Sequence, residues 1–123
     1  MTHDHLRDCI DACEECADEC EHCAAACLQE HDVKALANCI RLDRDCADVC
    51  RLAAALMARN SPFAEEFCDF CADVCDACGA ECERHEMEHC RLCAAACRAC
   101  AEECRRMAIG IAGDRASGTQ HAM

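Results

Sequence analysis

The chain has 123 residues, enough for one small domain with a modest core. Nineteen of them are cysteine, a density typical of disulfide-stapled secreted scaffolds, but only four glycines and one proline are present, which argues against such a loop-rich class. A net charge of −13 without Trp or Tyr disfavours nucleic acids and anionic membranes as partners.

The first residues, MTHDHLRDC, lack the apolar stretch of an export signal, and no apolar run is long enough to span a membrane. We therefore expect a cytoplasmic protein whose thiols stay reduced. In that compartment, many cysteines indicate a metal or redox role in place of a disulfide framework.

Four segments in chain order are predicted to form helices, at about residues 3–30, 33–59, 62–83 and 85–108. Their cysteines recur mostly at alternating gaps of three and four residues, a pattern that places them on one seam of a helix. The spacers are mainly Ala, Glu, Asp and Arg, which favour or tolerate helix and leave the opposite face charged. The cysteines of the four segments are Cys9, Cys13, Cys16, Cys20, Cys23 and Cys27; Cys39, Cys46 and Cys50; Cys68, Cys71, Cys75, Cys78 and Cys82; and Cys90, Cys93, Cys97, Cys100 and Cys104.

The boundaries of these helices carry recognisable signals. Asp32 is a candidate cap for the second helix, and residues 60–62, Asn-Ser-Pro, indicate a stop followed by a new start. Gly110 and Gly113 are expected to end the fourth helix, which leaves 111–123 as a flexible tail.

The connections between the helices are short, so neighbouring helices must run antiparallel. We therefore predict an all-α fold, an up-down-up-down antiparallel four-helix bundle over residues 1–110, with cysteines lining the core. The segments CADVC and CAAAC each occur twice, so the helices resemble variations on one repeat.

Several uses of a thiol-lined core are open at this point. Packing alone is a poor explanation for nineteen cysteines, because Leu or Ala would fill a core without the oxidation hazard. Disulfides between residues three or four apart on one helix would restrict the unfolded chain little. Zinc is usually held by knuckles and loops, the ferredoxin spacing is absent, and thioredoxin chemistry needs a βαβ fold. A zinc or general heavy-metal buffer remains an alternative, and an iron–sulfur electron-transfer protein is a less favoured one.

Copper(I) matches the pattern better. It is soft, binds thiolate strongly, and accepts two or three sulfurs. Residues three and four apart are neighbours on a helix surface, so two sulfurs of one helix can reach one ion and facing helices can bridge. If each Cu⁺ replaces one thiol proton, the charge of the core does not change, which matters where solvation is lost.

The stretches MEHCRLCAAACRACAEECRRMA and FCADVCDACGAEC, with HCAAAC earlier, resemble the bacterial copper storage proteins, and specifically their cytosolic branch. The resemblance covers residues 3–108. It implies a tetramer of four-helix bundles, each of which binds many Cu(I) ions along its core through cysteine pairs. The second helix departs from an even ladder, because it carries only three cysteines.

Four further residues are candidate uptake ligands at one end of the bundle: His31, His85, Met87 and His89. The alternative for each is an ordinary solvated helix end. Met57 and Met107 continue two seams at the opposite end and are expected to fill the core there. An apolar stripe on the third helix, which includes Phe63 and Phe70, indicates self-association.

The function we expect is cytosolic storage and sequestration of Cu(I), with roughly one ion per cysteine and no enzymatic activity. All nineteen cysteines are predicted metal ligands. The expected partners are copper ions, further copies of the chain (a tetramer by resemblance) and a copper chaperone as candidate donor, with neither nucleic acid nor membrane.

Overall fold

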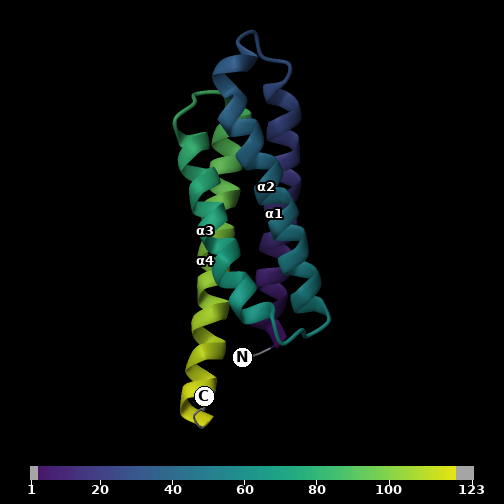
Figure 1. Ribbon diagram of the computed structural model, residues 1–123, viewed down its shortest axis with the longest axis vertical. Coiled ribbons are helices and arrows are strands. Elements are labelled where there is room, and N and C mark those ends of the chain that lie inside the picture. The colour runs from purple at the N-terminus through teal and green to yellow at the C-terminus, as the bar shows by residue number, and fades with distance from the viewer. Residues whose placement is uncertain (1–2, 119–123) are drawn as a thin grey trace.

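A computed structural model describes the backbone of residues 3–118 and the side chains of residues 6–108. The elements are α1 (His3–Cys27), a 3-10 turn η1 (Val33–Leu36), α2 (Ala37–Ala58), α3 (Ala64–Glu83) and α4 (Glu88–Gly118). The long helices run alternately up and down along one axis (Figure 1). The predicted all-α antiparallel four-helix bundle is confirmed.

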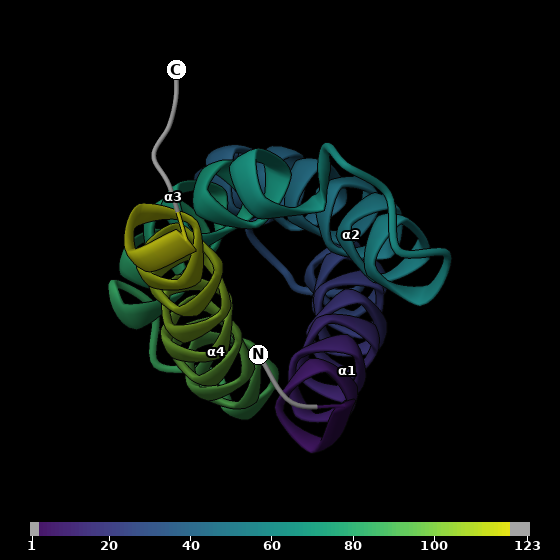
Figure 2. The same ribbon diagram turned by 90° about the horizontal axis from the view of Figure 1, so that it is seen from below.

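The helices form a closed ring around a single core. Each long helix packs against the next one in the chain, and α4 packs back against α1 (Figure 2). Small buried residues follow seam cysteines in every helix, at Ala17, Ala47, Ala72 and Ala101. A Cβ added at Gly79 would lie 3.3 Å from the Cβ of Cys97, so glycine permits the close approach of α3 and α4. Close packing of this kind brings the sulfurs of facing helices together.

Exposed ion pairs join neighbouring helices on the outside. Between α1 and α2, Glu21 lies 2.9 Å from Arg44 and 3.0 Å from Arg51. Between α3 and α4, Arg98 lies 2.8 Å from Glu83. Such surface pairs contribute little net stability, but opposite charges facing each other favour this helix register.

The first two links differ from the sequence expectation. α1 ends at Cys27, and the chain reaches η1 through tight turns in which Glu30 N–H donates to the Cys27 carbonyl. Asp32 accepts a hydrogen bond from Ala35 N–H at 3.4 Å, so it caps η1 and not α2, which begins at Ala37. After α2, Asn60 adopts a left-handed φ of 55°, and Phe63 N–H donates to the Ser61 hydroxyl, so α3 starts only at Ala64.

The fourth helix also differs at both ends. It begins at Glu88, so His85 lies in the turn after α3 and not in a helix. It continues past the expected end near residue 108 as far as Gly118, because neither Gly110 nor Gly113 takes the positive φ that ends a helix. The predicted tail over 111–123 therefore begins as helix, and residues 119–123 lie outside the described part of the chain. Among residues 3–118, no helix combines the length and apolar character that a membrane span needs.

Candidate metal centre

Nineteen thiols converge on the axis of the bundle. Every cysteine is free and has 0% exposure. α1 contributes six of them, α2 three, and α3 and α4 five each. Because gaps of three and four keep each set on one stripe, the four stripes all face inward. The structure therefore brings every predicted cysteine into one core, and their role as ligands stays a prediction.

The sulfurs lie close enough to share metal ions. Cys50 Sγ lies 3.6 Å from that of Cys75, 3.7 Å from that of Cys71 and 3.8 Å from that of Cys100. Sets of four sulfurs lie within 4.8 Å of one another, and Cys16, Cys20, Cys46 and Cys97 each belong to more than one such set. Because the sets overlap, one thiolate can bridge two ions. Shared clusters are therefore favoured, in preference to separate sites with four ligands of their own. The sets include Cys13, Cys71, Cys100 and Cys104; Cys16, Cys46, Cys50 and Cys75; Cys16, Cys20, Cys46 and Cys97; Cys20, Cys78, Cys93 and Cys97; and Cys23, Cys27, Cys39 and Cys90.

At the end of the bundle where α1 ends and α4 begins, one imidazole joins the thiols. His89 Nδ1 lies 3.5 Å from Cys23 Sγ, 3.6 Å from Cys90 Sγ and 3.9 Å from Cys27 Sγ. Its other nitrogen, Nε2, lies 2.8 Å from a carboxylate oxygen of Glu30. A carboxylate only accepts hydrogen bonds, so Nε2 donates and the Nδ1 lone pair faces the sulfurs. We call this end the mouth.

The other three candidate uptake ligands lie differently. His85 Nε2 pairs with Glu81 at 2.9 Å, which directs that ring to α3. Met87 is half-buried against the core, and His31 is exposed in the turn before η1. Among the described residues, His89 is the histidine that hydrogen-bonds to sulfur.

Asp43 is the residue that the sequence analysis missed. Its side chain is on α2 at 0% exposure, and its Oδ1 accepts hydrogen bonds from Cys78 at 3.2 Å and Cys93 at 3.3 Å. A signal was available, because positions 39, 43, 46 and 50 keep the gaps of four, three and four. Asp43 therefore stands at a cysteine position of the α2 seam.

Burial disfavours the ionised forms of the groups in this core. Loss of solvation raises the pKa of Cys90 to about 11 and also raises the pKa of Cys27. Burial, followed by electrostatic repulsion from Cys93, raises the pKa of the Asp43 carboxyl to about 10. A neutral core can exchange thiol protons for Cu⁺ one for one and stay neutral, which avoids the penalty of a buried net charge.

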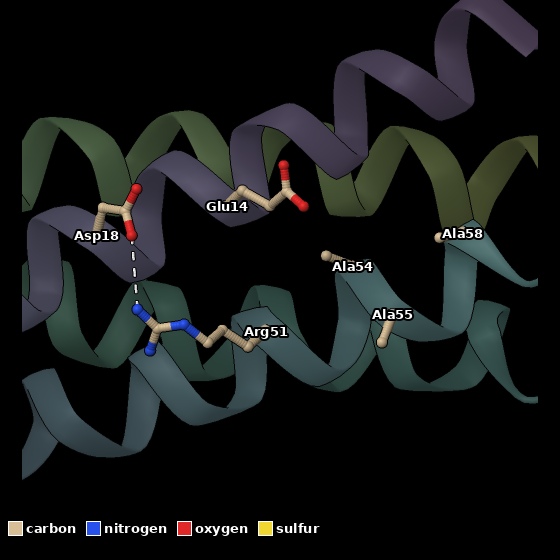
Figure 3. A pocket seen from close by; sticks show the side chains of 6 residues that line it. All are labelled: Glu14, Asp18, Arg51, Ala54, Ala55 and Ala58. Carbon is tan, nitrogen blue, oxygen red and sulfur yellow. Dashed lines mark hydrogen bonds and ion pairs between the residues drawn. The ribbon is translucent and has the colours of Figure 1, made fainter.

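The opposite end of the core is apolar. Met57 and Met107 are 1% and 3% exposed, and Ala53 takes the next seam position of α2 after Cys50. The nearby groove on the outer surface does not reach the sulfurs. It has a volume of about 470 Å³, and it is lined by Glu14, Asp18, Arg51, Ala54, Ala55 and Ala58. Figure 3 shows Arg51 reaching across it to Asp18.

The model of the copper storage protein family matches residues 2–109. A Cu(I)-bound copper storage protein, BsCsp3, is 51% identical with a TM-score of 0.82, and the match covers 85% of this chain and 98% of that one. A cytosolic copper storage protein from Streptomyces lividans, solved with five coppers, is 44% identical with a TM-score of 0.84, over 87% of this chain and 94% of that one. An uncharacterized cysteine-rich protein, YhjQ, of Bacillus subtilis (strain 168) is 53% identical over 81 residues, 66% of this chain and 75% of that protein.

Proposed function

The chain belongs to the copper storage protein family, and from that membership we propose that it stores and sequesters Cu(I) in the cytosol on the thiolates of its core. The observation that carries the proposal is the overlap of fully buried four-sulfur sets from all four helices. Cu(I) bound by bridging thiolates, about one ion per thiol, leaves such a core neutral. Zinc in separate Cys₄ sites would leave two negative charges per site in a core without water.

The count of bound metal tests this function. Reduced, copper-free protein is titrated anaerobically with Cu(I) held by a competing chelator, and the metal is counted per chain. We expect saturation at roughly one Cu(I) per thiol, with absorption confined to the ultraviolet. Saturation at about four or five ions would indicate tetrahedral Cys₄ sites and favour the zinc alternative. Displacement of the bound Cu(I) by excess Zn(II) would contradict the proposal as well.

Copper uptake through the mouth is the second part of the proposal. A neutral imidazole is a weaker ligand for Cu(I) than a thiolate, so His89 can capture an ion and pass it to Cys23 or Cys90. Glu30 supports this role because it fixes the Nε2–H tautomer. His85 and Met87, next to His89 in the chain, and the exposed His31 are proposed to collect ions further out.

A matched pair of histidine variants tests the mouth. His89→Ala should slow Cu(I) loading in stopped-flow measurements while the final count stays nearly the same. His22→Ala removes an exposed histidine of α1 and should load at the wild-type rate. Equal loading rates in both variants would show that copper enters elsewhere, although storage itself would stand.

Self-association is proposed from apolar side chains that the bundle leaves uncovered. Phe63 is 66% exposed and Phe70 52% exposed, both at or near the start of α3. A second copy of the chain would cover them, and the tetramer suggested by the resemblance is the assembly we propose. Sedimentation of wild type against Phe70→Glu tests it, because an interface with this ring at its centre should dissociate in the variant. A wild-type monomer would refute it.

A further inference from the structure

Cysteines four residues apart on one helix form close sulfur pairs in the core. In the described part of the chain, six such pairs have their Sγ atoms 3.9–4.0 Å apart. About one turn of helix separates the two members, so the backbone fixes their spacing before any ligand binds. The pairs are Cys16 and Cys20; Cys23 and Cys27; Cys46 and Cys50; Cys71 and Cys75; Cys93 and Cys97; and Cys100 and Cys104.

A sulfur of a neighbouring helix completes such a pair to a triangle. Cys13 Sγ on α1 lies 3.6 Å from the sulfurs of both Cys100 and Cys104 on α4. We call this arrangement, two sulfurs one turn apart on one helix and a third from a facing helix, a triad. The facing helices are neighbours in the ring, either α1 with α4 or α2 with α3 (Figure 2).

Four triads that share no sulfur can be chosen from this core. At the mouth, Cys90 Sγ lies 3.9 Å from Cys23 Sγ and within 4.8 Å of Cys27 Sγ. The four triads take up twelve of the nineteen thiols. They are Cys13 with Cys100 and Cys104; Cys20 with Cys93 and Cys97; Cys50 with Cys71 and Cys75; and Cys90 with Cys23 and Cys27.

Three converging thiols are the ligand set that trivalent arsenic prefers. Arsenic(III) is a soft centre, and it binds three sulfurs in a pyramid whose remaining position is a lone pair. The three sulfurs of such a pyramid lie in contact with one another. The sides of the Cys13 triad and of the Cys50 triad measure 3.6–4.0 Å, so their sulfurs already lie in this arrangement. Preformed ligands reduce the ordering that binding would otherwise require.

The reaction with arsenic also preserves the charge of the core. At neutral pH, arsenic(III) in water is arsenous acid, As(OH)₃, which is uncharged. Three As–O bonds break and three As–S bonds form, and each thiol proton leaves with a hydroxyl group as water. Arsenic stays trivalent, and no electron is transferred. Reactants and product are all neutral, so the fully buried site avoids the penalty of an uncompensated charge.

We propose that the copper-free bundle binds arsenic(III), taken up as arsenous acid, in triads of one intrahelical cysteine pair and one facing cysteine, at about four arsenic atoms per chain. The proposal goes beyond copper storage and does not depend on it, because the binding uses free thiols and no copper. The two cargoes share ligands, so each excludes the other from an occupied triad.

The count of bound arsenic is the first test. Copper-free protein is kept reduced by a phosphine, since a dithiol reductant would itself bind arsenic, and is titrated anaerobically with arsenite. Native mass spectrometry should show about four arsenic atoms per chain, each in place of three protons, and X-ray absorption should show three sulfur neighbours and no oxygen. Two protons lost per arsenic would overturn the triads. So would saturation at six, the most that nineteen thiols can hold three at a time, because the sulfurs would then rearrange freely.

A matched pair of variants tests the rule that defines a triad. Asp43→Cys creates a new four-residue pair with Cys39, and Cys82 Sγ faces both, at 3.7 Å from Cys39 Sγ and 3.5 Å from Asp43 Oδ1. The count should rise from about four to about five. Ala53→Cys also adds a buried thiol on α2, but Val49 and Met57 stand four residues away on either side, so no pair forms and the count should not change. No gain in Asp43→Cys, or equal gains in both variants, would overturn the rule.

Urea denaturation of wild type tests whether the triads are preformed, and it decides the question if circular dichroism shows that Asp43→Cys does not fold. A folded-state site exposed to a hundred times its dissociation constant lowers the unfolding equilibrium constant about a hundredfold. Arsenite should therefore raise the urea midpoint. An unchanged or lower midpoint would overturn the proposal, because the thiols of the unfolded chain would then bind arsenic equally well. Failure of copper storage is distinct, since it would be seen in the Cu(I) titration and not in these copper-free measurements.

Discussion

The Asp43 carboxyl gives the copper-free bundle a pH-dependent stability that one substitution can isolate. Its side chain is 0% exposed, and its pKa is raised to about 10, first by burial and then by electrostatic repulsion from Cys93. Thiols face it from every helix, and Cys23 of α1 and Cys39 of α2 join those of α3 and α4. Asp43→Asn has the same shape but does not ionise, so a comparison of the two proteins reports this one group.

The sign and size of the effect follow from proton linkage. In the folded chain the carboxyl keeps its proton up to about pH 10, whereas in the unfolded chain it ionises with a pKa near 3.8. Unfolding between these values releases one proton, so the free energy of unfolding falls by about 1.4 kcal/mol for each pH unit of increase. The contribution is complete below the lower value and is lost as pH rises. From about pH 5 to pH 7 it amounts to about 3 kcal/mol.

Urea denaturation of reduced, copper-free protein measures this difference. The free energy of unfolding of wild type minus that of Asp43→Asn should decrease by about 3 kcal/mol over the window from about pH 5 to pH 7. Asp45→Asn removes an exposed carboxylate of the same helix and should leave the pH dependence of wild type nearly unchanged. Parallel pH profiles for wild type and Asp43→Asn would refute the reasoning, because they would mean that Asp43 is already ionised in the folded core.

Three further predictions concern the copper-free bundle. Reduced protein without metal should show a strongly helical circular dichroism spectrum, since protonated cysteines pack as small apolar groups; a coil spectrum that becomes helical only with copper would contradict this. The thiols of the folded protein should react slowly with iodoacetamide near neutral pH and quickly in urea, because burial raises the pKa of Cys27 and Cys90. Equal reaction rates with and without urea would indicate an open core. Met57→Ala should lower the free energy of unfolding by about 3 kcal/mol in urea denaturation and leave the copper count unchanged, whereas a lost ion would make Met57 a ligand.

The fold was predictable because its signal is repeated along the whole chain. Gaps of three and four between cysteines define a helix seam, and the short links leave an antiparallel bundle as the arrangement that buries four seams. The helix ends were less predictable. Local hydrogen bonds decided them, such as the one from Phe63 N–H to the Ser61 hydroxyl that precedes α3. A glycine ends a helix only where its φ turns positive, and Gly110 and Gly113 do not.

The mouth was predictable as a location but not in its geometry. Sequence placed four candidate ligands at one end of the bundle, and among the described side chains His89 is the one of these that hydrogen-bonds to the sulfurs of Cys23 and Cys90. The start of α4 at Glu88 decides this, because it puts His89 in the first helical turn and leaves His85 outside, beside Glu81. Glu30 was not foreseen, since its pairing with His89 joins residues 59 positions apart.

Asp43 and Ala53 show two ways of filling a seam position without cysteine. Both are on α2 at 0% exposure, and both continue the spacing of Cys39, Cys46 and Cys50. Ala53, near the apolar end, meets the needs of packing alone. The carboxyl group of Asp43, in contrast, lowers the stability of the copper-free chain at neutral pH, because unfolding lets it ionise. A group that opposes folding where alanine or cysteine would fit is expected at a site of function. At that position the carboxyl group meets the thiols of Cys78, Cys82 and Cys93.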